Sequence, residues 1–176
     1  MPEIRQNPAT REWVIIATER AKRPEDFVDE KDEEEDVPEY LESCPFCPGN
    51  EGKTPPEIMS YRTNGGKWTL RVVPNKFPAL VPEGVPVREE DLDFFRRMDG
   101  LGQHEVIIET PKHNTGFGRI DDEKALEIVT AYRDRYIDLS KDKRFKLVKV
   151  FRNQGKDAGT SIEHPHSQIV ATPIVP

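Results

Sequence analysis

The sequence lacks the patterns that mark membrane-spanning, secreted and disulfide-stapled proteins. Its 176 residues include only two cysteines, which excludes a framework of several disulfides. No run of about 18 apolar residues occurs, so no membrane-spanning helix is expected. The first residues also lack the basic and then apolar pattern of a secretory signal peptide. These absences predict a cytoplasmic protein that forms one domain of ordinary size and has no membrane partner.

The negative charge of the chain is concentrated in one segment. The formal net charge is −7, but residues 25–42 alone hold eleven acidic side chains and a single base, Lys31. We interpret 25–42 as a flexible, solvated acidic loop. Removing its charge of −10 leaves the rest of the chain at +3, which suits a phosphorylated ligand. An excess this small does not indicate a nucleic-acid partner.

Hydrophobic periodicity predicts an α+β fold with a largely antiparallel sheet. Apolar residues spaced by three, four and seven predict a long helix over 122–139, with Asp121 as its N-cap. A shorter helix is expected over 87–98. Short β-branched or alternating runs predict strands over 12–18, 67–73, 104–110, 145–151 and 168–172, and a continuation after Pro74 over 77–81. This order of elements is typical of the α+β class.

The two cysteines, Cys44 and Cys47, have the CxxC spacing that lets two thiolates bind one metal ion from a tight turn. They would supply half of a tetrahedral zinc site, and two histidines would have to converge on them to complete it. A thioredoxin-like redox pair is the alternative, although no βαβ pattern surrounds the motif. Zinc is the favoured interpretation, because residues 44–56 are rich in proline and glycine and indicate a knuckle-like turn.

Residues 153–168 carry the strongest chemical signal in the chain. They include two of its four histidines, His164 and His166, after a loop rich in glycine and hydroxyl side chains and before an apolar run. A neutral imidazole is a good nucleophile toward phosphorus. Backbone N–H groups and hydroxyls of a glycine-rich loop can hold phosphate oxygens. The segment therefore predicts transfer of a phosphoryl or nucleotidyl group.

The motif HPHSQ over 164–168 resembles the active-site signature of galactose-1-phosphate uridylyltransferases, a branch of the histidine triad superfamily. Four further segments agree in order: RAKRP over 20–24, CPFCPGNE over 44–51, VPNKFPAL over 73–80, and HEV over 104–106 with PKH over 111–113. The resemblance implies a histidine-triad-like domain with a mainly antiparallel sheet, one long helix and a zinc knuckle. It also implies that 1–176 is a single nucleotidyltransferase domain, the N-terminal half of a two-domain family chain.

The resemblance implies roles for particular residues. His166 would be the nucleophile that forms a covalent nucleotidyl-histidine intermediate, and Gln168 would hydrogen-bond the phosphoryl oxygens. The cofactor would be zinc, held by Cys44, Cys47, His113 and His164. The substrate would be bound by Arg20, Arg23, Asn75, Asn153, Gly159, Ser161 and Gln168. By contrast, His104 is expected to be structural, and Trp13 and Trp68 are expected in the core.

The implied reaction is uridylyl transfer between UDP-glucose and a hexose 1-phosphate, as in galactose metabolism, by double displacement. The partners would be a nucleoside diphosphate sugar and a hexose 1-phosphate. A homodimer is expected, because an apolar surface left by a missing second half tends to be covered by another chain. One alternative is adenylyl transfer involving ADP-glucose or dinucleoside polyphosphates, since the sequence does not distinguish uracil from adenine. Another is an inactive, zinc-stabilised nucleotide-binding half-protein.

Overall fold

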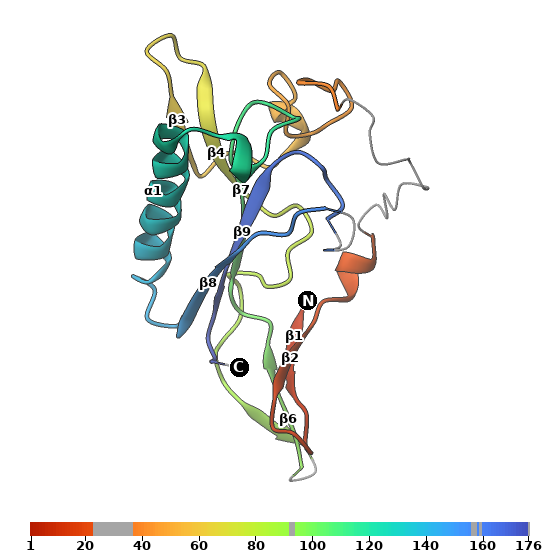
Figure 1. Cartoon of the computed structure of the whole chain (residues 1–176). Helices are drawn as coiled ribbons and strands as arrows, with labels where there is room; N and C mark the ends of the chain where they lie inside the picture. Colours follow the sequence, from red (N-terminus) through yellow and green to blue (C-terminus); the bar gives the residue numbers. More distant parts are fainter. Residues whose placement is uncertain (23–36, 92–93, 156–157, 159, 176) are drawn as a thin grey trace.

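The computed structural model describes residues 1–22, 37–91, 94–155, 158 and 160–175. These residues form two antiparallel sheets and one α-helix, so the predicted α+β fold is confirmed. In Figure 1 the helix covers one face of the larger sheet, and the smaller sheet lies at the lower end of the molecule. Arg23, Gly159 and residues 25–36 of the predicted acidic loop lie outside the described residues.

The larger sheet has five strands in the order β3-β4-β7-β9-β8, and every neighbouring pair is antiparallel. The strands are β3 (Met59–Arg62), β4 (Trp68–Pro74), β7 (Gln103–Ile108), β8 (Leu147–Phe151) and β9 (His166–Thr172). Four of them fall at the predicted strands, whereas β3 was not predicted. The central strands β4, β7 and β9 bury apolar side chains toward the helix, among them Leu70, Ile107 and Ile169.

The helix α1 spans Asp122–Leu139, as predicted, and the Asp121 side chain caps it by accepting a 2.8 Å hydrogen bond from the backbone N–H of Lys124. Its buried face packs on the larger sheet through Ile128, among other residues. Arg135 also faces inward and makes two 2.8 Å hydrogen bonds to the buried carboxylate of Glu105 on β7. Removing either partner would leave a buried charge without compensation, so this pair fixes how the helix sits on the sheet.

The smaller sheet shows that the helix predicted over 87–98 is wrong. Its strands, in the order β2-β1-β6-β5, are β1 (Glu3–Gln6), β2 (Trp13–Ile16), β5 (Glu89–Asp91) and β6 (Phe95–Asp99). Ion pairs join opposed residues of the β5–β6 hairpin, Arg96 with Glu90 at 2.9 Å and Arg97 with Glu89 at 3.0 Å. Pairing with β1 provides long-range contacts that local propensity does not reveal.

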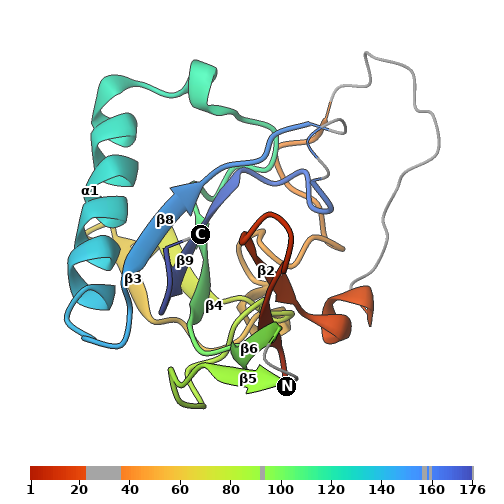
Figure 2. The same ribbon diagram turned by 90° about the horizontal axis from the view of Figure 1, so that it is seen from below.

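The continuation of β4 over 77–81 is also wrong, because among the residues of that stretch only Val81 forms a bridge, an isolated one to Leu101. The chain passes from the small sheet to the large one beside this bridge. A Cβ atom on Gly102 would lie 2.4 Å from the carbonyl oxygen of Ala171 on β9, so this close approach requires glycine. Figure 2 shows the smaller sheet on one side of the larger sheet and α1 on the other.

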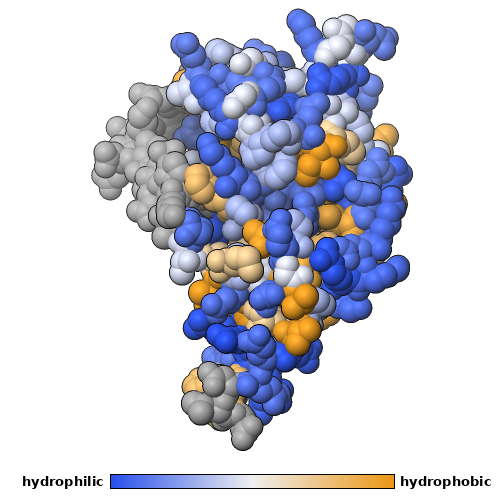
Figure 3. Space-filling model, turned by 180° about the vertical axis from the view of Figure 1, so that it is seen from behind, coloured by the Kyte–Doolittle hydropathy of each residue, from blue (hydrophilic) through white to orange (hydrophobic). Residues whose placement is uncertain are grey.

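Apolar side chains remain exposed on both the small sheet and the outer side of α1. Examples are Val14, Ile15 and Ile16 on β2 and Leu126 and Ile137 on α1. Seen from behind, the surface is mostly hydrophilic, with apolar residues in separate small patches (Figure 3). Within the described part of the chain, no helix has the length and apolar character needed to cross a membrane.

Candidate active site and metal centre

The structure brings two thiols and two imidazoles together in a closed group. Cys44 and Cys47 come from the turn before β3, His113 from the loop after β7, and His164 from the segment that leads into β9. All four side chains are buried, and their ligand atoms lie within 4.8 Å of one another. These are the four residues that the family resemblance implied as metal ligands.

The spacing of these atoms fits a tetrahedral zinc ion. Three sulfur–nitrogen distances are 3.7 Å for Cys44 to His164, 3.5 Å for Cys47 to His113 and 3.6 Å for Cys47 to His164. Zn–S and Zn–N bonds of ordinary length place tetrahedral S and N ligands about 3.6 Å apart. In each pair the histidine presents Nδ1. The residues present therefore fit one zinc with four protein ligands, which leaves no open coordination position.

Groups around the four ligands support this arrangement. The Nε2–H of His164 donates to the carbonyl oxygen of Thr110 at 2.7 Å, which leaves Nδ1 as the ligand atom. Backbone N–H groups of Phe46 and Leu41 donate to the sulfur atoms of Cys44 and Cys47, each at 3.4 Å. Both contacts stabilise negative charge on sulfur, which a bound zinc requires.

Burial favours the neutral forms of the ligands when no metal is bound. It raises the pKa of the Cys44 thiol to about 11 and lowers the pKa of His164 to about 4. Burial also lowers the pKa of His113. A metal ion that binds here must displace the Cys44 proton, so metal affinity depends on pH.

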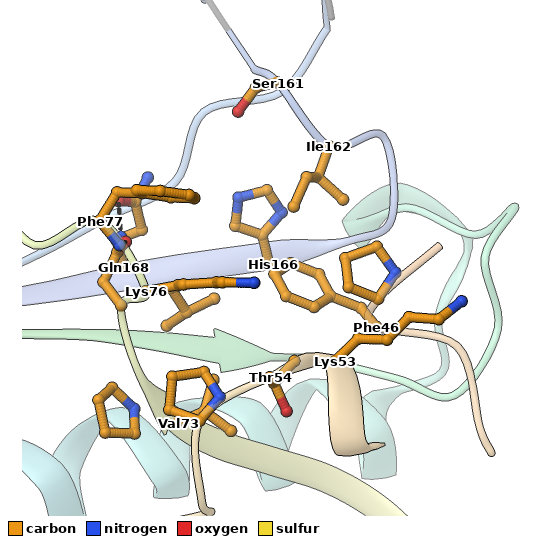
Figure 4. A pocket seen from close by; sticks show the side chains of 15 residues that line it. Phe46, Lys53, Thr54, Val73, Lys76, Phe77, Ser161, Ile162, His166 and Gln168 are labelled. Carbon is orange, nitrogen blue, oxygen red and sulfur yellow. Dashed lines mark hydrogen bonds between the residues drawn. The ribbon is translucent and has the colours of Figure 1, made fainter. Parts of the chain in front are cut away.

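A cavity of about 290 Å³ opens beside this group, and His166 lines it. Its walls are apolar at Phe46, Val73, Phe77 and Ile162, and polar at Lys53, Asn75, Lys76, Ser161 and Gln168. In Figure 4 the His166 ring points into the cavity, with Ile162 and Phe46 beside it. Two cationic side chains in a partly apolar cavity suit a ligand that joins phosphate groups to a less polar moiety.

A backbone contact fixes the tautomer of the neutral His166 ring. Its Nδ1 lies 2.8 Å from the carbonyl oxygen of His164, and a carbonyl can only accept a hydrogen bond. Nδ1 therefore carries a proton, and in the neutral ring Nε2 carries the lone pair that a nucleophile needs. This bond is accepted by the backbone of His164, one of the four clustered candidate ligands Cys44, Cys47, His113 and His164, here called the metal group. The orientation of the His166 ring is therefore tied to the position of that group.

Gln168 lies two residues beyond His166 on the same face of β9. Its carbonyl oxygen Oε1 lies 2.8 Å from Nε2 of His104 and 3.4 Å from Nδ2 of Asn75. Burial lowers the pKa of His104 to about 4, which keeps this imidazole neutral near pH 7. Sequence reasoning assigned His104 no part in the site. Its place at the start of the matched HEV segment was the one available signal.

A buried carboxylate supports the strand between His166 and Gln168 from behind. Glu109 accepts hydrogen bonds from the hydroxyls of Ser167 and Tyr132, the latter at 3.0 Å, and from Nε of Arg152 at 3.1 Å. Burial raises the pKa of the Tyr132 hydroxyl, so it remains a donor. This network ties β9 to α1 and to the end of β7, and it leaves the residue between the two site side chains little freedom.

Only some of the remaining predicted substrate-binding residues line the cavity. Asn75 and Ser161 line the cavity, and Arg20 donates from Nη1 to the carbonyl oxygen of Phe77 at 2.8 Å, which places it near the cavity wall. Asn153 is not among the lining residues. Sequence reasoning missed Lys53 and Lys76, although Lys76 lies inside the matched VPNKFPAL segment. Of the tryptophans, Trp68 is in the core, whereas Trp13 is only partly buried.

Comparisons with known proteins agree with this geometry. The family model described as galactose-1-phosphate uridyl transferase, N-terminal domain, matches residues 1–176. The chain is 36% identical to an ADP-glucose phosphorylase of Arabidopsis thaliana, over 99% of this chain and 50% of the relative. It is 32% identical to a galactose-1-phosphate uridylyltransferase of Thermotoga maritima, over 100% of this chain and 48% of the relative. The chain thus spans about half the length of these relatives.

Solved structures give the same result. The crystal structure of the ADP-glucose phosphorylase from Arabidopsis thaliana with bound ADP-glucose superposes with a TM-score of 0.67 at 34% identity, covering 100% of this chain and 50% of that one. The structure of a uridylyltransferase mutant superposes with a TM-score of 0.70 at 27% identity, covering 99% of this chain and 46% of that one. The resemblance in the sequence is confirmed: this chain belongs to the galactose-1-phosphate uridyl transferase family and matches its N-terminal domain.

Proposed function

We propose that this chain carries the nucleotidyl-transfer chemistry of a nucleotide-sugar transferase, with His166 as the nucleophile. The observation that carries the proposal is the His166 ring itself. Its Nδ1–H donates to the His164 carbonyl, so Nε2 carries the lone pair of the neutral ring, and the ring lines a cavity together with Lys53, Lys76 and Gln168. The substrates would be a nucleoside diphosphate sugar and a hexose 1-phosphate.

The reaction proceeds in two displacements at the α-phosphorus. Nε2 of His166 forms a bond to phosphorus, the bond to the bridging oxygen breaks, and hexose 1-phosphate leaves with the electron pair. The phosphate oxygen of a second hexose 1-phosphate then attacks phosphorus and displaces His166. Lys53 and Lys76 balance the phosphate charge, and the Gln168 amide donates to phosphoryl oxygens. Glutamine does not take up a proton from water, which favours transfer over hydrolysis.

We also propose that Cys44, Cys47, His113 and His164 hold one structural zinc. When bound, the ion supplies folding energy and fixes the segment before β9. His166 then receives its orientation from the carbonyl of a residue whose side chain is a ligand. The four protein ligands leave no coordination position for substrate, so the reacting groups are those of the cavity.

The preferred nucleotide is uridine, with UDP-glucose as donor in galactose metabolism. A second candidate is adenylyl transfer, because an ADP-glucose phosphorylase and its complex with ADP-glucose are among the similar proteins. The two are separated by offering UDP-glucose or ADP-glucose, each labelled at the α-phosphorus, to the same protein. Faster labelling of His166 by the adenosine compound would assign the chain to the second reaction.

The test of the proposal is covalent trapping. Protein incubated with the labelled nucleotide sugar should acquire an acid-labile, base-stable label, the behaviour of a phosphorus–nitrogen bond. His166→Ala should remove the label, whereas Ser161→Ala, a change in the same cavity, should retain it. Label that survives in His166→Ala contradicts the proposal. Nucleotide binding without labelling of the wild-type chain would support the inactive half-protein instead.

The expected homodimer remains a proposal as well. On the edge strand β2, Val14 and Ile16 point to one face and are 47% and 37% exposed, and Ile15 on the opposite face is 40% exposed. An edge strand with exposed apolar side chains tends to be covered by association. Sedimentation velocity of the chain at micromolar concentration should show a dimer, and a concentration-independent monomer would contradict it.

A further inference from the structure

We propose that His104 is a positioning residue for the transfer reaction, because its ring fixes which end of the Gln168 amide faces the cavity. The inference rests on the proposed function, and it adds a residue to which sequence reasoning gave only a structural role. Both ring nitrogens of His104 have defined partners. These partners determine the hydrogen positions on the imidazole, and the imidazole then determines the orientation of Gln168.

The first partner fixes the tautomer. The backbone N–H of Ala79 lies 2.9 Å from Nδ1 of His104, and a backbone N–H can only donate. Nδ1 must therefore be unprotonated. Because His104 is only 4% exposed, its doubly protonated form is strongly disfavoured, and the single ring proton lies on Nε2.

The second partner fixes the amide. Nε2 of His104 is 2.8 Å from Oε1 of Gln168, so the Nε2–H donates to this oxygen. Nδ2 of Asn75 also lies 3.1 Å from Nε2, but both nitrogens carry hydrogen in this tautomer, so the two donors share the acceptor Oε1 rather than bond to each other. Rotation of the Gln168 amide by half a turn would set its NH₂ group against the Nε2–H, with two donors facing each other. That arrangement would leave the buried Nε2–H without an acceptor, at a substantial cost.

Asn75, in the same loop, is oriented in the same way by a backbone N–H group. The backbone N–H of Phe77 donates to Oδ1 of Asn75 at 2.9 Å, which directs the Asn75 NH₂ group toward Oε1 of Gln168 at 3.4 Å. Two backbone N–H groups of one loop thus orient two side chains, and both side chains place a donor on Oε1. The side-chain hydrogen bonds of Gln168 to other described residues all reach this oxygen.

The orientation of the Gln168 amide determines which group it presents to the reacting phosphoryl group. With Oε1 held from behind, the NH₂ group is the part of Gln168 that can meet a ligand in the cavity it lines with His166 (Figure 4). A phosphoryl oxygen needs a donor there, and a flipped amide would present a second acceptor. His104 touches no substrate in this account and acts only through Gln168.

The kinetic test is a double-mutant cycle on the rate at which His166 takes up the α-phosphorus label in a single turnover. His104→Leu removes both ring nitrogens and should slow labelling by about tenfold or more. His104→Gln can place an amide NH₂ near the former Nε2 and should restore most of the rate. In a Gln168→Ala background, His104→Leu should cause no further loss, since the group it orients is absent.

A purely structural His104 would give a different pattern. In that case His104→Leu would slow labelling by the same factor with and without Gln168, and this result would overturn the proposal. An unchanged rate in His104→Leu with Gln168 present would overturn it too. Circular dichroism and zinc content of each variant verify that the comparison is made between folded proteins.

A second measurement needs neither activity nor a variant. Nitrogen-15 NMR of the wild-type chain at pH 7 should show His104 with the proton on Nε2 and none on Nδ1. A proton on Nδ1, or on both nitrogens, would overturn the positioning role. If the wild-type chain takes no label, the proposed function fails, while the NMR result still decides the inference about His104.

Discussion

The metal group and the cavity meet at His164 and His166, which lie two residues apart but differ in burial and in hydrogen-bond partners. His164 is fully buried, its ring is held by the Thr110 carbonyl, and its Nδ1 faces two cysteine sulfurs. His166 is only partly buried, and it lines a cavity with cationic and apolar walls. These surroundings support the two roles that we propose, a buried metal ligand for His164 and a nucleophile for His166.

We expect changes in the metal group to affect the cavity more than changes in the cavity affect the metal group. The His164 carbonyl holds the Nδ1 proton of His166, and the N–H of Glu109 donates to the carbonyl of the intervening Pro165 at 3.2 Å. Damage to the metal group should therefore lower both stability and transfer. Damage to the cavity should lower transfer alone. Single substitutions in each region test this asymmetry.

The largest effect is expected from His166→Gly, which removes the proposed nucleophile and retains the four candidate metal ligands. Labelling by the nucleotide sugar should fall by a factor of roughly 10⁴ or more, as is usual when a covalent nucleophile is lost. Zinc content and melting temperature should match those of the wild-type chain. A large loss of zinc in this variant would show that the two regions are not separable.

Cys47→Ser is the reciprocal change. Loss of a ligand from a buried four-ligand site should lower zinc occupancy and cost more than about 4 kcal/mol of unfolding free energy. Elemental analysis and denaturant titration measure the two quantities, and His166→Ala serves as the matched cavity control. Full occupancy with unchanged melting would contradict the metal assignment.

Low pH should lower the free energy of unfolding through both regions. A His104 variant separates the contribution made on the cavity side. The pKa of His104 is about 4 in the folded chain, below its ordinary value, so the unfolded chain binds the extra proton first as the pH falls. The stabilisation is present above about pH 6.5 and is lost between that pH and 4, amounting to about 3 kcal/mol. Denaturant titrations should show a shallower decline for His104→Gln, and an identical decline would contradict the shifted pKa.

The smallest effect concerns a cation of the cavity. Lys76→Ala should weaken nucleotide-sugar binding by about tenfold, since it removes one charge beside the phosphates. Calorimetry measures the affinity, and Lys141→Ala, which removes an exposed lysine paired with Asp138, is the matched control. Equal affinities for the two variants would remove Lys76 from the substrate site. Neither variant should change zinc content.

The sequence predicted the parts of the fold that have strong local patterns. The helix over 122–139 combines a long apolar period with an aspartate N-cap, so both ends were predicted correctly. The small sheet lacks such a pattern. Its strand β1 has four residues, of which only Ile4 is buried, and the β5–β6 hairpin is stabilised by pairing with a strand more than 80 residues earlier. No local window contains that contact.

The sequence also predicted only the part of the site that has a local pattern. The spacing of Cys44 and Cys47 indicated half of a metal site, but the convergence of His113 and His164 on it is a long-range property that only the family resemblance supplied. The role of His104 depends on the N–H of Ala79 and on Gln168, which lies 64 positions away. In the sequence it looks like any polar residue at the start of a strand. Hydrogen-bond direction becomes visible only when partners are placed in space.

The central claim, that His166 reacts while His164 binds metal, is tested most directly by locating a trapped nucleotidyl group in the zinc-loaded chain. Tandem mass spectrometry after brief incubation with UDP-glucose, together with zinc analysis of the same sample, would assign both histidines at once. The account predicts one nucleotidyl group on His166 and about one zinc per chain. A nucleotidyl group on His164, or on any other residue of a fully zinc-loaded chain, would contradict it.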